Sequence, residues 1–477
     1  MTSMIRTAQK KFSPRKEFRG RRVLIFGLGL YPQGSGAAAA RFFVRAGAKV
    51  TVTDLKTKKE LLPALRRLRG IKATYILGRH RLEDVERADL IVKNPGVPAN
   101  SPYLLRARAK GIPITSDTAL FFRYCPAPII GVTGTRGKST TSALIAETLK
   151  ADRRRTWLGG NIKISPLDFL EKARAGDWVV LELSSWMLES LDLERRSPRI
   201  AVFTNLLRDH LNTYKNMNDY GRAKSAIFRH QDRGDTAVLS WDNPWTRRLA
   251  RRAPGRRVWT SIKSRPPGDA VYLDAGKIVE VGGGRRQTIA SAASVTLKGE
   301  HNLENVLCAV AAARAAGAPL SAIQQALRGF RGLPDREEPV GVFGGVRFVN
   351  DTTATTPDAT IAALRALGKD QKLVLIAGGR DKELLFDELA RELPRFVKVL
   401  VTLPGSATEK LVSSIRRAKS KLPIYRAADM RSAVRASRDY AKPGELVLLS
   451  PGAASFGLFI NEFDRGEQFK KEVGRGK

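Results

Sequence analysis

The stretch GVTGTRGKSTT, residues 131–141, decides how the rest of the sequence is interpreted. It is close to the pattern G-x-x-x-x-G-K-[ST], in which backbone N–H groups and a lysine hold the phosphates of a nucleotide. That pattern requires a glycine five residues before Gly137, and this position holds Val132. The stretch is therefore either a chance match or a phosphate loop with a spacing of its own.

The sequence on either side favours a phosphate loop over a glycine turn with a chance lysine. The run APIIGVTG predicts a strand before the loop, and KSTTSALIAETLK predicts a helix after it. This context turns loop N–H groups and the positive end of a helix toward an anion. We expect ATP, with Lys138 at its terminal phosphates and the hydroxyl of Ser139 or Thr140 facing Mg²⁺. The residues expected to contact ATP here are Gly134, Thr135, Gly137, Lys138, Ser139 and Thr140.

The chain as a whole predicts an α/β protein of three domains. A length of 477 residues exceeds what one hydrophobic core supports, and short apolar strands alternate with helical stretches throughout. We expect a Rossmann-like N-terminal domain (1–126), a central P-loop ATPase-like α/β domain (127–334) and a Rossmann-like C-terminal domain (335–477). The weakly patterned residues 244–296, rich in Arg, Pro and Gly, predict surface hairpins of the central domain.

Composition limits the other classes of protein. The net charge of +38 is spread along the whole chain without interleaved aromatic residues, so we expect no specific nucleic-acid partner. No apolar run of about 18 residues and no secretory signal occur, which predicts a cytoplasmic protein without a membrane span. Cys125 and Cys308 lack the C-x-x-C spacing of metal and redox sites and are interpreted as buried thiols. We also expect a monomer.

Glycines also follow the first expected strand of the chain. The segment GLGLYPQGSG (27–36) lies between an expected strand and a helix, and Asp54 closes the second strand, where a ribose-binding carboxylate would lie. The glycine spacing is longer than in G-x-G-x-x-G and includes Pro32, which disfavours a dinucleotide. A different nucleotide and a purely structural turn both remain open.

Polar side chains are expected at strand ends of the central block. Glu182 ends the strand DWVVLELSS, and Asp209 and His210 follow the strand RIAVFTNL. With a loop hydroxyl and phosphate oxygens they could complete a Mg²⁺ site, although each residue alone is more often a helix cap or a solvated group. Asn302 and Asn305, at the start of a later helix, either contact a base or ribose or cap that helix.

Nine motifs, in order along nearly the whole chain, resemble those of the Mur ligase family, the ATP-dependent enzymes that form amide bonds in peptidoglycan precursors. They are TGTRGKSTT (133–141), GGN (159–161), LELSS (181–185), DH (209–210), YGRAK (220–224), GEHNLEN (299–305), GLPDRE (332–337), NDTTAT (350–355) and SPGAAS (450–455). The family's phosphate loop has the form TGTxGK[ST], so Val132 is no defect.

The resemblance implies that the N-terminal block binds the UDP of a substrate, the central block ATP and the C-terminal block an amino acid. It implies catalytic roles for Lys138, Lys224 and His210. Mg²⁺ would be held by Ser139, Glu182, His210 and Lys224, the last as a carbamylated lysine. Further ATP contacts are implied for Asn302, Asn305, Arg336 and Asp351. Substrate contacts are implied for Gly29, Leu30, Asp54, Asn94, Asn161, Lys382 and Ser455.

The implied reaction joins UDP-N-acetylmuramoyl-L-alanine to glutamate, D-glutamate first of all, through an acyl phosphate and a tetrahedral intermediate. ATP yields ADP and phosphate. Thr353 stands where the family usually has lysine, Glu462 where an aromatic residue is common, Met187 where glutamine is common, and Arg208 where glutamate precedes Asp-His. L-glutamate, another amino acid or a different acceptor therefore stay open. A dehydrogenase would leave the phosphate loop unexplained, and a nucleic-acid-binding protein would leave all nine motifs unexplained.

Overall fold

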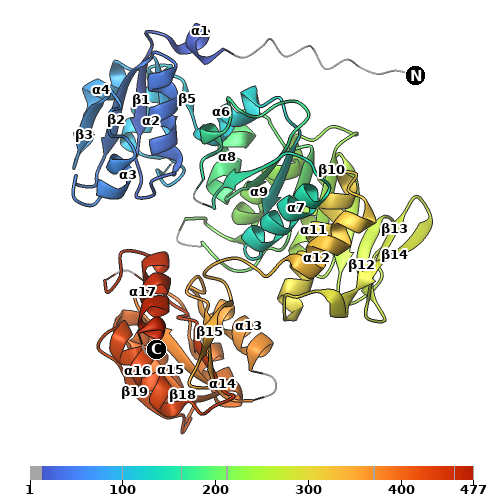
Figure 1. The fold of residues 1–477 in the computed structure, drawn as a ribbon. Coiled ribbons are helices and arrows are strands. Elements are labelled where there is room, and N and C mark those ends of the chain that lie inside the picture. Colours follow the sequence, from blue (N-terminus) through green and yellow to red (C-terminus); the bar gives the residue numbers. More distant parts are fainter. Residues whose placement is uncertain are drawn as a thin grey trace. The chain divides into compact units, whose positions relative to one another are not determined.

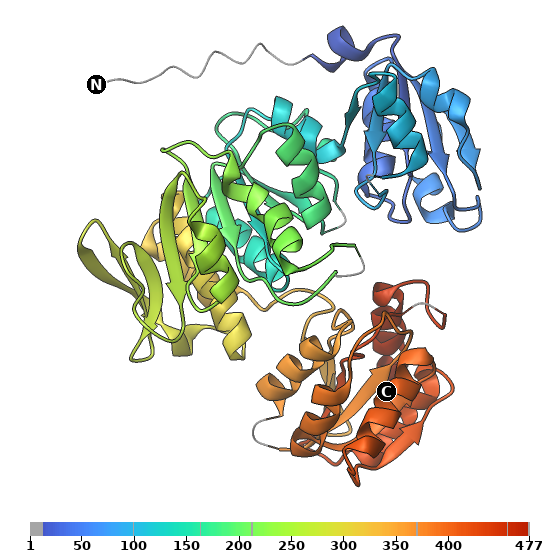
Figure 2. The same cartoon turned by 180° about the vertical axis from the view of Figure 1, so that it is seen from behind.

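The computed structural model describes residues 13–98, 100–162, 164–210, 213–368, 371–455 and 457–475, which form two compact units. The first unit takes the chain up to Ser294 together with Glu304–Gly329, and the second takes Val295–Leu303 and the chain from Phe330 onward. Figures 1 and 2 show three sheets, each built from one continuous part of the colour scale: blue, teal to yellow, and orange to red. The predicted α/β class with parallel sheets is confirmed.

The first sheet has five parallel strands in the order β3-β2-β1-β4-β5. Its strands are β1 (Arg22–Phe26), β2 (Lys49–Asp54), β3 (Thr74–Leu77), β4 (Leu90–Lys93) and β5 (Ile114–Thr115). Its helices are α1 (Pro14–Phe18), α2 (Ser35–Arg45), α3 (Leu62–Arg66), α4 (Leu82–Glu86), α5 (Pro102–Ala109) and α6 (Asp117–Tyr124). The strand order reverses between β1 and β4, and such a reversal opens a crevice at the carboxyl ends of the strands.

The second sheet has nine strands in the order β14-β13-β12-β11-β10-β9-β6-β8-β7. The strands are β6 (Ile129–Thr133), β7 (Thr156–Gly160), β8 (Trp178–Glu182), β9 (Ile200–Phe203), β10 (Thr236–Ser240), β11 (Arg256–Ser261), β12 (Ala270–Asp274), β13 (Lys277–Gly282) and β14 (Arg285–Ser291). The helices are α7 (Lys138–Ala151), α8 (Ser185–Leu193), α9 (Met217–Arg229), α10 (Pro244–Ala250), α11 (Glu300–Ala315) and α12 (Leu320–Gly329), with short 3-10 turns at Pro166–Asp168 and Ala292–Ser294. Buried apolar runs such as IIGVT in β6 suit a parallel strand covered on both faces.

The third sheet belongs to the second unit and has the order β15-β16-β20-β17-β18-β19. Its strands are β15 (Glu338–Phe343), β16 (Val346–Asn350), β17 (Leu373–Gly378), β18 (Val397–Leu403), β19 (Ile424–Arg426) and β20 (Leu446–Leu449). Its helices are α13 (Pro357–Leu367), α14 (Asp387–Phe396), α15 (Ser406–Arg417), α16 (Met430–Tyr440) and α17 (Glu462–Gly474). Only the edge strand β15 runs antiparallel to its neighbour, and its mixed burial fits an edge position.

Two sequence-based expectations need correction. The segment 244–296 does not form surface hairpins alone, because β11 and β12 continue the central sheet in parallel before β13 and β14 add antiparallel strands. Strand β9 ends at Phe203, so Asp209 and His210 lie in a loop beyond the strand rather than at its end. The domain limits at 126/127 and 334/335 stay a prediction.

The apolar core of the first unit is continuous, and both cysteines are buried, as the sequence predicted. One apolar cluster continues from the first sheet to the second through Phe121 of α6 and Phe169, whose rings pack edge to face at 5.3 Å. Cys125 and Cys308 are buried free thiols, and burial raises the pKa of each to about 12. Among the helices of the described residues, none has the length and apolar character needed to cross a bilayer. The monomeric state and the cytoplasmic location stay predictions.

Candidate functional site

Residues 134–137 form a loop between β6 and α7. Gly134 and Gly137 both have positive φ angles, of 151° and 81°. A Cβ atom on Gly134 would lie 1.9 Å from the Thr204 hydroxyl, and one on Gly137 would lie 1.9 Å from Oδ1 of Asn305. Val132 is buried inside β6, one residue before the strand ends. The chain turns at Gly134, and no glycine is needed at the position of Val132.

The segment 204–207 fixes the shape of this loop. The Thr135 N–H donates to the Asn205 carbonyl (2.9 Å), and the Leu207 N–H donates to the Thr135 hydroxyl (2.9 Å). The Arg136 N–H donates to Asn205 Oδ1 (2.9 Å), while the Thr204 hydroxyl donates to the Arg136 carbonyl (2.6 Å). The Thr135 hydroxyl and the N–H groups of Thr135 and Arg136 are therefore bonded to this segment, and the expected contact of Thr135 with ATP stays a prediction.

Two lysines meet at one carbonyl of the loop. Nζ of Lys138 donates to the carbonyls of Gly134 and Thr135, each at 3.1 Å. Nζ of Lys224, in α9, donates to the same Gly134 carbonyl at 3.0 Å and lies 4.8 Å from the ring centre of Tyr220. Two lysine side chains therefore lie at the loop where a polyphosphate would be bound.

The electrostatic state of Lys224 is unusual. Only 2% of this residue is exposed, and burial lowers the pKa of its ammonium well below the usual value. The charge of Lys138 lowers it further, whereas Asp209 and Glu182 raise it. A depressed pKa leaves a larger fraction of neutral amine, which is the nucleophilic form of lysine.

Glu182, the last residue of β8, connects the loop to a neighbouring turn. Its carboxylate accepts hydrogen bonds from the Ser139 hydroxyl (2.6 Å) and from Nδ2 of Asn161 (2.7 Å). The Asn161 N–H also donates to the Glu182 carbonyl (2.9 Å). The structure therefore brings together Lys138, Ser139, Asn161, Glu182 and Lys224, as expected if they share a site.

His210 lies near this group in a strained backbone conformation, with a φ of 54°. Its ring is 5.1 Å from that of Trp186 and 5.7 Å from that of Tyr220. Burial lowers the pKa of its imidazole, as do the charges of Lys224, Lys138 and Arg136, whereas Asp209 raises it. A neutral imidazole is the form that binds metals. Arg208, the departure before Asp-His, is exposed.

The described residues hold no cluster of three or more His, Cys, Asp or Glu side chains suited to a metal. A protein-only cage is therefore absent from the described part of the chain. Mg²⁺ is commonly bound by one or two carboxylates together with water and phosphate oxygens, and this arrangement needs few protein ligands. Glu182, whose bonds in the structure come from a hydroxyl and an amide, fits that chemistry.

The two asparagines expected near ATP lie at the start of α11. The side-chain oxygen Oδ1 of Asn305 lies close to Gly137. The backbone carbonyl of Asn305 accepts a hydrogen bond from the Thr141 hydroxyl (3.4 Å). Nδ2 of Asn302 donates to the Lys298 carbonyl (2.7 Å) and to Glu337 (3.3 Å). Asn305 thus belongs with the phosphate loop, whereas Asn302 is bonded within the second unit.

The glycine turn of the first sheet lies at the carboxyl ends of β1, β2 and β4. The buried Asp54 carboxylate accepts from the N–H groups of Leu28 (2.8 Å), Gly29 (3.1 Å) and Lys56 (2.9 Å). The hydrogen bonds show a structural role for Asp54, and its expected contact with a substrate stays a prediction. Asn94 packs directly beneath Gly27, where an added Cβ would lie 2.9 Å from Asn94 Cβ.

Sequence reasoning missed Lys93, the residue that holds the neighbouring NPGV segment. Nζ of Lys93 donates to the carbonyls of Val97 (2.8 Å), Asn94 (3.3 Å) and Pro95 (3.4 Å). The only available signal was a lysine at the end of an apolar strand. His80 and His230 are hydrogen-bonded to Thr53 and Asp192, respectively.

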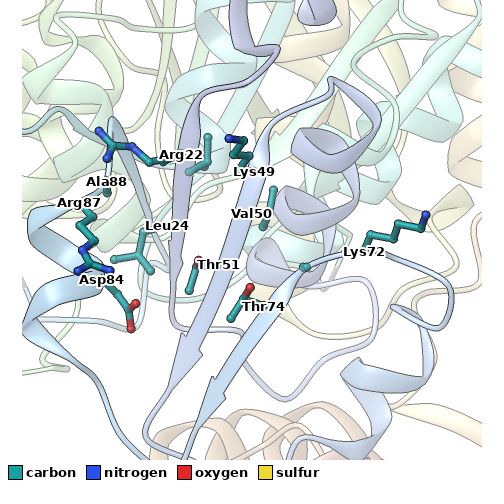
Figure 3. A pocket seen from close by; sticks show the side chains of 12 residues that line it. Arg22, Leu24, Lys49, Val50, Thr51, Lys72, Thr74, Asp84, Arg87 and Ala88 are labelled. Carbon is teal, nitrogen blue, oxygen red and sulfur yellow. The ribbon is translucent and has the colours of Figure 1, made fainter.

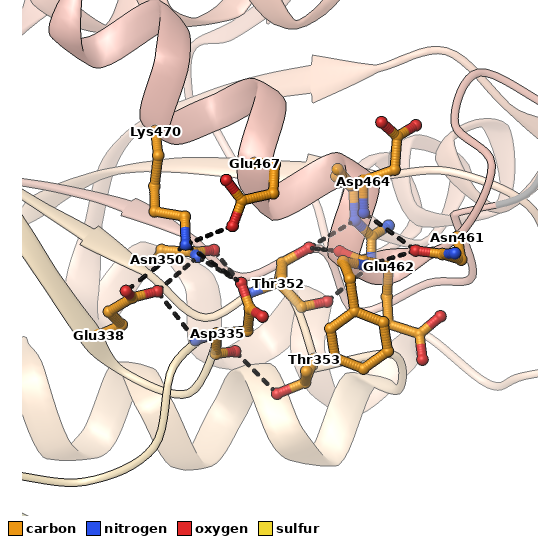
Figure 4. A network of polar contacts seen from close by, with 12 residues as sticks. Asp335, Glu338, Asn350, Thr352, Thr353, Asn461, Glu462, Asp464, Glu467 and Lys470 are labelled. Carbon is orange, nitrogen blue, oxygen red and sulfur yellow. Dashed lines mark hydrogen bonds and ion pairs between the residues drawn. The ribbon is translucent and has the colours of Figure 1, made fainter. Parts of the chain in front are cut away.

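In the second unit, Asp351 directly follows Asn350, whose side chain belongs to a network of polar contacts with Asp335 and Glu338 (Figure 4). Asp351 accepts from the Ser450 hydroxyl (2.9 Å) and from the Glu337 N–H (3.3 Å). Burial raises the pKa of its carboxyl to about 7, and the Glu337 charge raises it as well. The Thr353 hydroxyl, at the lysine position of the family, donates to the Asp335 carbonyl (2.9 Å).

Arg465 is the largest fully buried side chain of this unit and bonds to the same segment. It donates to the hydroxyl (3.0 Å) and carbonyl (2.8 Å) of Thr352 and to the Ala453 carbonyl (3.2 Å). Burial lowers the pKa of its guanidinium to about 10, while the charges of Glu462 and Asp351 raise it. The carboxylate of Glu462 is therefore partly balanced by Arg465.

The two residues expected to bind the amino acid lie on adjoining segments. Arg380 and Ala454 exchange backbone hydrogen bonds of 2.8 and 3.1 Å, which joins the segment of Lys382 to that of Ser455. Lys382 is exposed and Ser455 is buried. The structure thus places both beyond the carboxyl ends of β17 and β20, two neighbouring strands in the middle of the third sheet.

A hollow of about 600 Å³ lies elsewhere, over the amino-terminal halves of β1, β2 and β3 (Figure 3). Leu24, Thr51 and Thr74 line it, with Lys49 and Arg87 among the charged residues around them. Ligands of open parallel sheets bind at the carboxyl ends of the strands, so this position is not the expected one. Its threonines and lysines are those of an ordinary solvated sheet face.

A parallel α/β scaffold with a lysine-bearing glycine loop between strand and helix defines a phosphate-loop nucleotide enzyme. Three family models match successive parts of the chain: the MurD-like N-terminal domain of Mur ligases (residues 21–116), the Mur ligase middle domain (132–313) and the Mur ligase glutamate ligase domain (335–452). The chain belongs to the Mur ligase family. It is an ATP-dependent ligase, as the resemblance implied.

Relatives of known name support this assignment. The chain is 43% identical over 465 residues to the UDP-N-acetylmuramoylalanine--D-glutamate ligase of Roseiflexus sp., covering 96% of this chain and 99% of that one. It is 40% identical over 453 residues to the enzyme of the same name from Symbiobacterium thermophilum, covering 95% and 97%.

Solved structures share the fold at low identity. The UDP-N-acetylmuramate-alanine ligase MurC of Thermotoga maritima aligns with a TM-score of 0.64 at 20% identity, covering 96% of this chain and 100% of that one. A pseudomurein peptide ligase type C from Methanothermus fervidus gives 0.60 at 16% identity, with the same coverage. MurF ligase of Thermotoga maritima, in complex with ADP, gives 0.59 at 17%, covering 98% and 99%.

Proposed function

We propose that this protein joins D-glutamate to the carboxyl group of UDP-N-acetylmuramoyl-L-alanine, with conversion of ATP to ADP and phosphate. The names of the full-length relatives at 43% and 40% identity support the substrates. The observation that carries the chemistry is the convergence of Lys138 and Lys224 on the Gly134 carbonyl, beside the bonded pair Ser139 and Glu182. In this arrangement Lys138 is placed to stabilise the transferred phosphoryl group, and Lys224 presents an amine beside the residues proposed to hold Mg²⁺.

In the proposed first step, an oxygen of the substrate carboxylate attacks the γ-phosphorus of ATP, and ADP leaves. Backbone N–H groups at the start of α7 bind the phosphates, and Lys138 exchanges its carbonyl partners for phosphate oxygens. Glu182, Ser139 and His210 are the residues that would hold Mg²⁺, which supplies charge neutralisation when bound. The product is an acyl phosphate, a far better acylating agent than a carboxylate.

In the second step, the amine of glutamate attacks the acyl carbon, giving a tetrahedral intermediate. The C–O bond to phosphate then breaks, the amine loses a proton, and an amide and free phosphate remain. Lys138 and the loop N–H groups stabilise the negative charge that develops on the phosphate oxygens. Lys382 and Ser455 are the residues proposed to bind the amino acid.

Lys224 is proposed to act as a carbamate. Its neutral amine attacks CO₂, forms an N–C bond and releases a proton, which leaves a carboxylate on Lys224 near the Mg²⁺ site. The low pKa of the buried ammonium supports this proposal because it supplies the neutral amine. Carbamylation would also relieve the repulsion between Lys224 and Lys138.

The proposal is tested by phosphate release with UDP-N-acetylmuramoyl-L-alanine, ATP and Mg²⁺ against a panel of D- and L-amino acids. We expect turnover that depends on D-glutamate. Turnover with L-glutamate or another amino acid, but not with D-glutamate, would indicate that the amino-acid specificity differs from that of the named relatives. Thr353 and Glu462 would then be the first residues to test. Absence of amino-acid-dependent turnover with every member of the panel would contradict the ligase proposal itself.

A further inference from the structure

A buried carboxylate that the reaction above does not use lies beside the Asn161 turn. Asp117 is the first residue of α6, and only 2% of it is exposed. Its Oδ2 accepts from the Ser165 hydroxyl (2.7 Å) and its Oδ1 from the Thr118 hydroxyl (3.3 Å). The Ser35 hydroxyl is buried without a hydrogen bond of ordinary geometry, yet it helps to lower the pKa of this carboxyl.

Burial and hydrogen bonds have opposite effects on the pKa of the Asp117 carboxyl. Burial raises the pKa of its carboxyl, and the three hydroxyls oppose that shift. Its position at the start of α6 also favours negative charge, since the N-terminus of a helix carries positive charge. Among the described residues Asp117 forms no ion pair, so its burial is costly and its hydrogen bonds to hydroxyls are what hold the carboxyl in place.

Ser165, the partner of Asp117, is tied to both sheets of the first unit. Its N–H donates to the Gln33 carbonyl (2.9 Å), in the glycine segment that precedes α2. One residue earlier, the Ile164 carbonyl accepts from the Gly160 N–H (2.7 Å), which closes the turn that carries Asn161. Asn161 in turn donates to Glu182, the partner of Ser139 in the phosphate loop.

We propose that Asp117 is a positioning residue that, through Ser165, fixes the Asn161 turn between the glycine segment of the first sheet and the phosphate loop. Asn161 is thereby held ready for the nucleotide-sugar acceptor, an inference that rests on the proposed function. Loss of the Asp117–Ser165 bond frees the turn at one end, while the phosphate loop keeps its own bonds to residues 204–207. The acceptor, rather than ATP, is therefore bound less well.

The test compares Asp117→Asn, Ser165→Ala and the double variant in steady-state kinetics. We expect the KM for UDP-N-acetylmuramoyl-L-alanine to rise about tenfold in each single variant, with kcat and the KM for ATP within about twofold of the parent. The double variant should be no worse than the single ones, because both remove the same bond. Should Asp117→Asn fail to fold, Ser165→Ala alone decides the test.

Asp168→Asn is the matched control. It removes the ion pair between the side chains of Asp168 and Arg41 (2.7 Å), which joins the same parts of the chain, and it leaves in place the backbone bond from the Asp168 N–H to the Ser165 carbonyl (3.1 Å). We expect it to leave the acceptor KM within about twofold of the parent. The proposal would be overturned if Asp168→Asn and Ser165→Ala raised the acceptor KM equally. It would also be overturned if Ser165→Ala left the kinetics unchanged, or if it lowered kcat and raised the KM values for acceptor and ATP alike.

A second measurement separates this inference from the proposed function. If the parent protein shows no turnover with this acceptor, the proposed function fails, and amide hydrogen exchange decides whether Asp117 positions the turn. Faster exchange at Gly160, Asn161 and Ser165 in Ser165→Ala, with unchanged exchange at Thr135 and Leu207, supports it. Unchanged exchange at the first three amides contradicts it.

Discussion

Lys138 is the residue on which the phosphate-loop account depends most. We expect Lys138→Ala to lower kcat about a thousandfold, because the charge on the transferred phosphoryl group loses its nearest cation. Lys150→Ala, in the same helix but exposed and paired only with Glu147 at 2.8 Å among the described bonds, is the control and should retain full activity. Steady-state phosphate release measures both, and near-normal rates in Lys138→Ala would refute the role.

Lys224 gives a second residue-scale prediction. Lys224→Ala should lose most activity and regain part of it with added formate or acetate, because a small carboxylate can replace the carbamate. Arg222→Ala, on an exposed side of the same helix and paired with Asp219, should keep its activity without any response to these anions. Full activity of Lys224→Ala, or a loss that no carboxylate reverses, would contradict carbamylation.

The loop glycines allow a comparison at equal backbone strain. Gly137 and Gly70 have nearly the same φ, 81° and 80°, but a Cβ on Gly137 meets Asn305 at 1.9 Å whereas one on Gly70 meets no atom within 4 Å. Gly70→Ala should cost about 1 kcal/mol of unfolding free energy, the ordinary strain of a left-handed residue. Gly137→Ala should cost about 2 kcal/mol more and weaken ATP binding. Equal denaturation midpoints would contradict the close contact.

At the scale of elements, local patterns predicted the strand, loop and helix around Gly134, and the strand that ends at Glu182. An apolar run of five residues followed by glycines and an Ala- and Thr-rich helix leaves few alternatives. The motifs also brought Glu182 and Lys224 to the loop, because a whole-chain resemblance carries three-dimensional information that periodicity lacks. These parts of the fold and site could be read from the sequence.

The supporting elements could not be predicted in the same way. The bonds from residues 204–207 to Thr135 span about seventy residues, and no local pattern encodes a pairing at that separation. Asp117 and Ser165 each look like an ordinary helix-start or loop residue until the fold brings them to 2.7 Å. The parallel pairing of β11 and β12 with the central sheet was missed, since only hairpins were expected for this region and its arginines mask the apolar pattern of β11.

The β16 segment carries a prediction for stability against pH. The folded-state pKa of Asp351 is about 7, above the value of an unfolded Asp near 3.9, so the folded protein binds more protons between these pH values. Stability from this group is present below about pH 4 and is lost as the pH rises through about 7. Asp351→Asn should therefore show a smaller fall in melting temperature from pH 5 to pH 8 than the parent protein. An identical fall would contradict the raised pKa.

Considering the molecule as a whole, the net charge of +38 is spread over the chain, and many of the arginines form exposed ion pairs. Arg22 forms an exposed ion pair with Asp89, and Arg256 forms one with Asp269. Exposed ion pairs of this kind add little to the free energy of unfolding. The excess can attract a multiply anionic nucleotide sugar over distances limited by salt screening. It gives no support to a nucleic-acid partner.

The loop at Gly134 is proposed to hold ATP so that a carboxyl group is converted to an acyl phosphate. The most direct measurement labels the carboxyl oxygens of UDP-N-acetylmuramoyl-L-alanine with heavy oxygen and follows the label by mass spectrometry. One labelled oxygen should appear in each phosphate released during D-glutamate-dependent turnover, because the oxygen bridging carbon and phosphorus leaves with phosphorus. Amide formation with unlabelled phosphate would contradict the account.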